Sequence, residues 1–217
     1  MRFAGYSLVA AMSLAAPAIA AEGGTEGAGP AASAGAPQAP PHEERIKAFI
    51  GAAFGSGTAR YTVNGTTVSF SDQFQGASDE THLIAVKVVS FGIEVRPKLY
   101  AGMDLTGLTQ SGTVGTSKTN LQLSNYCASL TWFPCERGLF LKGAAGVSSL
   151  FKGVGSESER SNGLGVLVSA GYALRVHGAH HLTVSAEQGW QTYWGSSDTK
   201  PDSSQYNAAY VGYMWMP

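Results

Sequence analysis

Charged residues are scarce in this sequence, and the few present nearly cancel. Asp, Glu, Lys and Arg make up 13% of the 217 residues, and the formal net charge is −1. Ordinary soluble domains carry about 25% charged residues. Because the chain has no basic excess, nucleic acid is not an expected partner. The mean hydropathy of −0.01 is also too low for a bundle of membrane helices.

Cysteine is nearly absent as well. The two cysteines, Cys127 and Cys135, lie in one predicted strand and in the turn that follows it. At ~3.3 Å per residue the two would be roughly 25 Å apart, whereas a disulfide needs Cα atoms within about 7 Å of each other. We therefore expect two free thiols.

Motifs that carry chemistry are missing too. The Gly-rich stretches match no phosphate-binding loop, dinucleotide fingerprint or nucleophile elbow. The run HGAHH at 177–181 is a conceivable metal cluster, but no carboxylate or cysteine stands beside it, and the polarity of a turn explains it. The sequence therefore predicts no cofactor, no metal and no catalytic site.

The first 44 residues lack any strand pattern. Arg2, the apolar run YSLVAAMSLAAPA and the small-residue sequence AIA predict a cleaved signal peptide over 1–20. Residues 21–44 are mostly Gly, Ala and Pro, with too few large apolar side chains to fold. We expect a disordered periplasmic tail over 21–44 and one folded domain over 45–217.

What the sequence has in abundance is glycine, with 28 residues, set in segments that alternate. Over 163–176 every second residue from Leu164 is apolar or aromatic, and most of the intervening residues are small or polar. A period of two predicts strands with two different faces. A glycine-rich face suits the crowded interior of a small barrel, and the apolar face would then meet lipid.

Eight such segments follow Arg45. The predicted strands cover 46–61, 82–96, 99–110, 120–133, 138–152, 163–176, 181–194 and 205–216. Short turns alternate with longer polar segments, as in outer-membrane barrels, and an even strand count puts both barrel termini on the periplasmic side. A change of phase within 82–96 predicts a bulge near Val89–Ser90. The motif VNGT at 63–66 predicts a small extra hairpin in the first long loop.

Three stretches carry a family resemblance: LFLKGAAGVS at 139–148, GLGVLVSAGYALRV at 163–176, and the final YNAAYVGYMWMP. With them, residues 45–217 resemble the small eight-stranded outer-membrane β-barrel family, the group that contains OmpA-like transmembrane domains and OmpX. The resemblance implies an all-β fold, an eight-stranded antiparallel up-and-down transmembrane β-barrel, in a Gram-negative cell outer membrane. It also implies outer-membrane lipid and the barrel-assembly machinery as partners. Met216 and Pro217 depart from the family's terminal aromatic, which Trp215 would replace.

The alternation assigns each polar or aromatic residue a side of the barrel wall. We expect a lumen polar network of Asp104, Lys142, Arg175, Glu187 and Gln191, with Glu187 paired with Arg175 or Lys142 because buried charges must be paired. Aromatic residues towards the strand ends should form interfacial girdles. They are Trp132, Tyr172, Trp190, Trp194, Tyr213 and Trp215.

These features predict a porin-like but non-catalytic outer-membrane protein with a packed polar lumen and extracellular loops that interact with an unidentified partner. Eight strands enclose just enough room for side chains, so a permanent channel is not expected. Two alternatives remain open. A lipid A-modifying barrel enzyme would need a histidine near the outer rim, where His82 is the candidate. A soluble periplasmic, lipocalin-like barrel would invert the faces, so that Leu164, Val166, Val168 and Tyr172 line a ligand cavity.

Overall fold

The computed structural model describes residues 47–135, 138–195 and 200–217, and these ranges form a single antiparallel sheet. Its strands are β1 (Ala48–Val63), β2 (Thr66–Ser69), β3 (Ile84–Arg96), β4 (Leu99–Val114), β5 (Ser117–Trp132), β6 (Leu139–Val154), β7 (Glu157–His177), β8 (His180–Tyr193) and β9 (Ser203–Trp215), with a short 3₁₀ helix η1 (Ser71–Phe74) after β2. The predicted signal peptide and tail, 1–20 and 21–44, lie outside the described residues.

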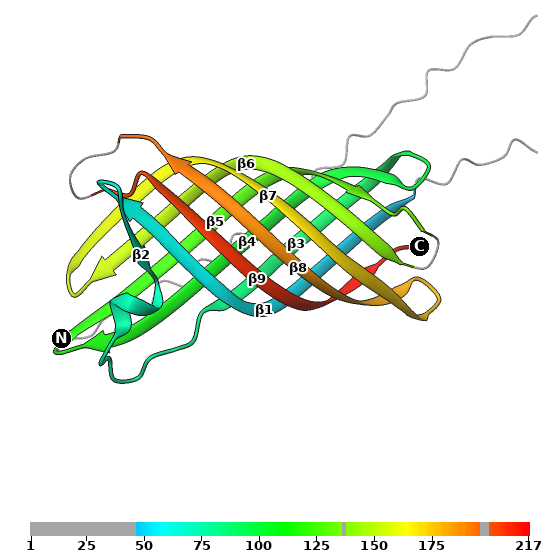
Figure 1. Ribbon diagram of the computed structural model, residues 1–217. Helices are drawn as coiled ribbons and strands as arrows, with labels where there is room; N and C mark the ends of the chain where they lie inside the picture. Colours follow the sequence, from blue (N-terminus) through cyan, green and yellow to red (C-terminus); the bar gives the residue numbers. More distant parts are fainter. Residues whose placement is uncertain (1–46, 136–137, 196–199) are drawn as a thin grey trace, which may run out of the picture. The chain divides into compact units, whose positions relative to one another are not determined.

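Eight of the strands close into a ring. β1 pairs with β3, each later strand pairs with the next, and β9 pairs back with β1 from Ile50↔Trp215 to Thr62↔Ser203 (Figure 1). The predicted eight-stranded antiparallel barrel is confirmed. No helix among the described residues is long and apolar enough to span a membrane.

Two local predictions on the wall of the barrel are also confirmed. Asn64 and Gly65 have φ of 49° and 75°, the left-handed pair that a tight hairpin turn needs, and they join β1 to the short β2. The register between β3 and β4 shifts between Lys87 and Val89, which is the bulge that the change of phase indicated. Both the hairpin and the bulge can be predicted because each depends on a few neighbouring residues.

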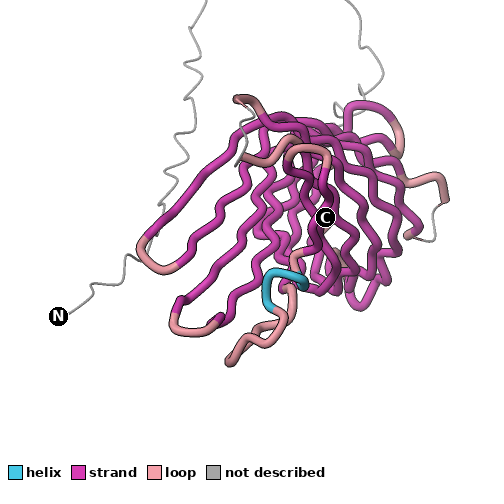
Figure 2. The backbone as a smooth tube through the Cα atoms, turned by 60° about the vertical axis from the view of Figure 1, so that its left-hand side comes forward, coloured by secondary structure: helices cyan, strands magenta, loops and turns pink. Residues whose placement is uncertain are grey.

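The connections between strands differ between the two ends of the barrel, which we call the turn end and the loop end. The turn end has the β3–β4, β5–β6 and β7–β8 connections and the last residues of the chain, and the loop end has β2 and η1 (Figure 1). The helix η1 is the cyan segment in Figure 2. The predicted strand bounds leave longer polar segments at 111–119 and 153–162. In the structure these segments are instead strand extensions joined by tight turns at Gly115 and Gly155. Beyond the membrane both strand faces are polar, so the apolar alternation that marks a strand disappears while the ladder continues.

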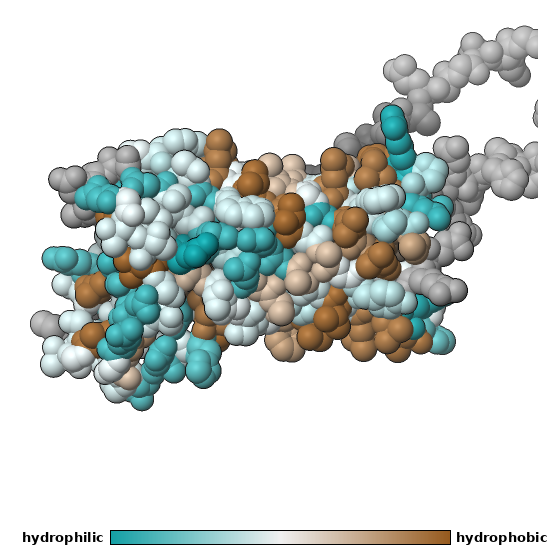
Figure 3. All heavy atoms as spheres, in the orientation of Figure 1, coloured by the Kyte–Doolittle hydropathy of each residue, from teal (hydrophilic) through white to brown (hydrophobic). Residues whose placement is uncertain are grey.

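The wall has an apolar outer face and a mixed inner face. Leu164, Val166 and Val168 are 56%, 52% and 51% exposed, whereas Leu167 between them is 2% exposed. Hydrophobic residues gather on the outside towards the turn end, and hydrophilic residues cover the loop end (Figure 3). The soluble, lipocalin-like alternative is therefore wrong, because its proposed cavity lining lies on the outside of the barrel.

Inward glycines make room for aromatic rings from the neighbouring strand. A Cβ on Gly189 would lie 2.1 Å from a ring carbon of Tyr206, its direct cross-strand partner. Gly92 with Phe49 and Gly171 with Phe140 repeat the arrangement, each with a ring carbon at 2.4 Å. The missing side chains of these glycines thus leave room for the aromatic rings of neighbouring strands.

Side chains from the inner face form a cluster at each end of the barrel, with charged residues between the two clusters. The loop-end cluster is apolar and includes Phe70 and Phe74, each 1% exposed, from the segment around η1. The turn-end cluster contains Phe49, Tyr100, Phe133, Phe140, Ala173 and Met214. Strand β6 passes from Phe140 through buried Lys142 to Leu150 of the loop-end cluster, so the charged residues lie between the two apolar clusters.

Candidate functional site

Glu187 is the centre of the first ion-paired group in the interior. Its carboxylate accepts a hydrogen bond from Lys87 Nζ at 2.6 Å and another from the Tyr206 hydroxyl at 2.8 Å. The Tyr210 hydroxyl lies 3.5 Å from the same carboxylate, and Lys87 Nζ lies 4.6 Å from the centre of the Tyr210 ring. The side chains of Lys87 and Glu187 are 7% and 0% exposed. Burial of this kind is tolerated because the charges are paired and hydrogen-bonded.

A second ion pair joins Lys142 to Asp104. Lys142 Nζ lies 2.7 Å from Asp104 Oδ1 and donates to Ser90 Oγ at 2.7 Å. The two pairs together carry two cations and two anions, so the charged layer is neutral. Asp104 Oδ2 has no hydrogen-bond partner among the described residues, although it is buried.

The structure places two other predicted network residues apart from these pairs. Gln191 accepts a hydrogen bond from Ser204 Oγ at 2.7 Å and donates to Asn125 Oδ1 at 3.4 Å, so it belongs to a neutral group nearer the loop end. Arg175 is exposed at the turn end, where its Nε donates to the Gly178 carbonyl at 2.7 Å. The expected pairing of Glu187 with Arg175 or Lys142 is wrong. Arg175 follows the last buried inward residue of β7, Ala173, and so emerges into solvent.

Lys87 is the interior residue that the sequence reasoning missed. It lies between the apolar residues Val86 and Val88, so an alternation with these valines on the outer face puts a lysine inside the barrel. A charge at such a position requires a buried counter-charge. Which carboxylate supplies it depends on the lateral register of eight strands, and the pattern within one strand does not contain that information.

The predicted girdle residues are all exposed on the outer wall or its rim: Trp132, Tyr172, Trp190, Trp194, Tyr213 and Trp215. Most of them lie near the turn end, where Trp132 ends β5, Tyr172 pairs with Leu139, and Trp215 pairs with His180. Trp190 and Trp194 lie towards the other end of β8. Aromatic residues at two levels flanking an apolar band are the usual marks of membrane interfaces.

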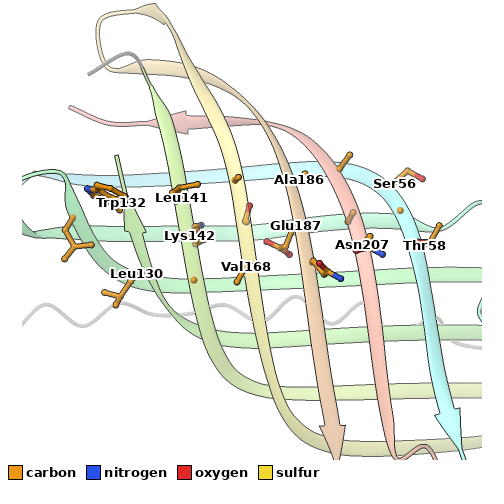
Figure 4. Close-up of a pocket in the computed structure, with 18 residues that line it drawn as sticks. Ser56, Thr58, Leu130, Trp132, Leu141, Lys142, Val168, Ala186, Glu187 and Asn207 are labelled. Atoms are coloured by element: carbon orange, nitrogen blue, oxygen red, sulfur yellow. The ribbon is translucent and has the colours of Figure 1, made fainter. Parts of the chain in front are cut away.

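A shallow groove crosses the outer wall obliquely from β1 to β5 (Figure 4). Small outward residues of adjacent strands face one another along it, with Ala209 opposite Ala186 and Ala186 opposite Ala170. Lys142 and Glu187 also line it, but both side chains are buried and paired inside the barrel. The two charged side chains that line the groove are therefore already engaged in ion pairs.

The loop end carries charges of both signs in near balance. The described basic residues there are Arg60, Lys118, Lys152, Arg160 and Lys200, and the acidic residues are Asp72, Asp79, Glu80, Glu157, Glu159 and Asp202. His82 is exposed in the segment before β3, and no side-chain hydrogen bond to it occurs within the described ranges. The described part of the chain contains no group of His, Cys, Asp and Glu side chains that could hold a metal ion.

A closed ring of eight strands with an apolar outer belt defines a transmembrane β-barrel of the outer-membrane type. The structure is similar to that of Ail, the attachment invasion locus protein of Yersinia pestis, solved with the heparin analogue sucrose octasulfate. The TM-score is 0.51 at 11% identity, and the match covers 79% of this chain and 99% of that chain. Identity at this level shows a shared fold, and the predicted outer-membrane localisation agrees with that fold.

Two further solved structures match with lower TM-scores. Neisserial surface protein A matches with a TM-score of 0.49 and 11% identity, over 77% of this chain and 96% of that chain. OprG from Pseudomonas aeruginosa matches with a TM-score of 0.40 and 10% identity, over 79% of this chain and 96% of that chain. No protein-family model matches the sequence, and no curated protein matches it.

Proposed function

We propose that this protein is a non-catalytic outer-membrane barrel whose interior is sealed and whose loop end binds a partner at the cell surface. The observation that carries the proposal is the order of side chains inside the ring: an apolar cluster, a neutral layer of ion pairs, and an aromatic cluster. Such a filling leaves no continuous polar path for ions. The charged side chains inside are engaged with one another, which argues against a catalytic role for them.

The loop end is the part of the protein proposed to act. Its balanced charge does not favour a polyanion of the kind in the Ail complex, so we expect a partner that is recognised through mixed polar contacts. Outer-membrane lipid would surround the belt, and the barrel-assembly machinery would insert the chain. No observation favours the lipid A-modifying alternative, since His82 has no hydrogen-bonded carboxylate or hydroxyl side chain in the described residues.

Two experiments test this proposal. In planar lipid bilayers the purified protein should give no steady conductance, and a stable open level would refute the sealed interior. To test orientation, an epitope tag is inserted at the Gly115 turn of the loop end or, as the matched control, at the Gly178 turn of the turn end. Intact cells should bind antibody against the first tag alone. Labelling of the second tag alone would reverse the assignment of the ends.

A further inference from the structure

The outer wall carries two amide side chains at a depth where the neighbouring strand β7 is apolar. Gln188 of β8 and Asn207 of β9 lie directly opposite each other, and both belong to the outward set of their strands. Asn207 is exposed and Gln188 is half-buried. Neither amide forms a side-chain hydrogen bond with the described part of the chain. The ion pairs of the interior and the proposed loop-end function do not involve them.

The position of these amides along the strands puts them inside the apolar belt. Trp190, one of the predicted girdle residues, is the next outward residue of β8 towards the loop end. Val168 lies directly opposite Gln188 on β7, and the exposed residues Val166 and Leu164 continue the apolar row from there towards the loop end. The amides therefore lie deeper in the membrane than Trp190, beside valine and leucine side chains that face lipid.

Small residues border the amides on the side towards the turn end. The next outward residues there are Ala186 on β8, Ala209 on β9 and Ser56 on β1, which are neighbours in the register of the sheet (Figure 4). Figure 3 views this face from outside, and hydrophilic side chains reach from the loop end towards its middle. We name this part of the shallow groove the amide patch, and its members are Ser56, Thr58, Ala186, Gln188, Asn207 and Ala209. Small side chains of this kind allow a neighbouring wall to approach closely.

The chemistry of the amide patch restricts what can cover it. A polar group in the hydrocarbon region costs free energy unless it is hydrogen-bonded. An acyl chain has no donor and no acceptor, so lipid hydrocarbon leaves both amides unsatisfied. A side-chain amide carries two donor hydrogens and an acceptor oxygen, so the amide patch is complementary to a second amide patch at the same depth. A two-fold interface supplies this match, because it brings the same surface of two copies together.

We propose that two copies of this chain associate within the membrane through their amide patches. Gln188 and Asn207 of one copy hydrogen-bond to the same two residues of the other copy, and the small side chains of Ala186 and Ala209 allow the two walls to approach. The contact uses β1, β8 and β9, so it leaves the opposite wall of each barrel in contact with lipid. The proposal depends on the location in the outer membrane and is independent of what the loop end binds.

The test reconstitutes the full chain in phosphatidylcholine vesicles and measures disulfide cross-linking between copies. Cys135 is exposed and is replaced by serine, whereas Cys127 is buried inside the barrel and is kept. The reporter is Ala209→Cys in the amide patch. Its matched control is Ala128→Cys, at an exposed alanine of β5, which is four strands from β9 in either direction around the ring. Ala209→Cys should give a covalent dimer that persists as the lipid is increased, whereas the Ala128→Cys product should arise only from collisions and disappear on dilution.

Substitution of the amides tests their role in the contact. With the Ala209→Cys reporter, the double variant Gln188→Leu/Asn207→Leu should weaken association about tenfold or more, because each copy loses both of its amides. Leucine facing lipid is compatible with the barrel, and the change of gel mobility on boiling checks that the variant has folded. The exchange Gln188→Asn/Asn207→Gln keeps an amide at both positions and should retain the dimer.

Three results would overturn the proposal. One is equal cross-linking of Ala209→Cys and Ala128→Cys at every lipid dilution. Another is a dimer that the leucine double variant leaves unchanged, since the amides would then not hold the two copies together. The third is loss of the Ala209→Cys dimer on dilution. If added lipid A then slows maleimide labelling of Ala209→Cys, the amide patch binds a lipid with polar groups at that depth and not a second copy.

Discussion

The buried pair of Glu187 and Lys87 gives the sharpest stability prediction. Glu187→Gln keeps the size of the side chain and removes its charge, which strands the Lys87 ammonium in a site where that side chain is 7% exposed. The Tyr206 hydroxyl can still donate to an amide oxygen, so the main loss is the charge pairing. Breaking a buried ion pair in this way costs about 3–5 kcal/mol.

The assay is equilibrium unfolding by urea in lipid vesicles, followed through tryptophan fluorescence. Glu187→Gln should lower the free energy of unfolding by about 3–5 kcal/mol. The double variant Lys87→Met/Glu187→Gln should cost less than the sum of the single variants, because no charge is left alone. The matched control is the rim pair of Lys47 and Glu94, whose side chains are 64% and 17% exposed. There Glu94→Gln should cost less than about 1 kcal/mol.

Two results would refute this reasoning. One is a free energy of unfolding for Glu187→Gln within about 1 kcal/mol of the parent, which is the range expected of an exposed pair. The other is strict additivity of Lys87→Met and Glu187→Gln, which would show that the two residues do not act as a pair. Loss of a lipid-modification activity with unchanged stability would instead make the interior a catalytic site.

The remaining predictions concern the wall. Gly189→Ala should destabilise the barrel by about 1–3 kcal/mol, since its Cβ displaces the Tyr206 ring, whereas Gly143→Ala, with nothing within 4 Å, should be nearly neutral in the same urea assay; equal effects would contradict the ring-over-glycine packing. Val168→Arg on the lipid-facing side of β7 should cost about 2–4 kcal/mol, and Asn162→Arg, on the same side nearer the loop end, about 0–1 kcal/mol. Equal costs would mean that depth in a membrane is irrelevant at these positions.

Much of the barrel wall can be predicted from the sequence, because alternate residues of a strand lie on opposite faces. The alternation from Leu164 predicted which residues face outward, the phase change near Val89 predicted a bulge, and Asn64–Gly65 predicted a hairpin. The strand extensions on either side of the Gly115 and Gly155 turns were missed, because a strand with two polar faces has no apolar period of two.

The interior follows from the sequence less completely. Alternation places Lys87 and Glu187 on the inner face, but their contact joins β3 to β8, and it depends on the stagger of all eight strands. Arg175 belongs to the inward-facing set of β7, but it lies beyond the buried part of the barrel, because β7 continues past its last buried residue. The face on which a side chain lies can therefore be predicted from its own strand. The side chain with which it pairs across the lumen depends on how the eight strands close into a ring.

The most direct test of the account is where the expressed protein resides and whether its barrel resists detergent. Cell membranes are separated into inner, outer and soluble fractions, and each is run on an SDS gel with and without boiling. The account predicts a protein in the outer-membrane fraction that resists extraction by alkaline carbonate and changes its mobility when boiled, because a closed barrel unfolds only on heating. A protein found wholly in the soluble fraction, with the same mobility before and after boiling, would contradict it.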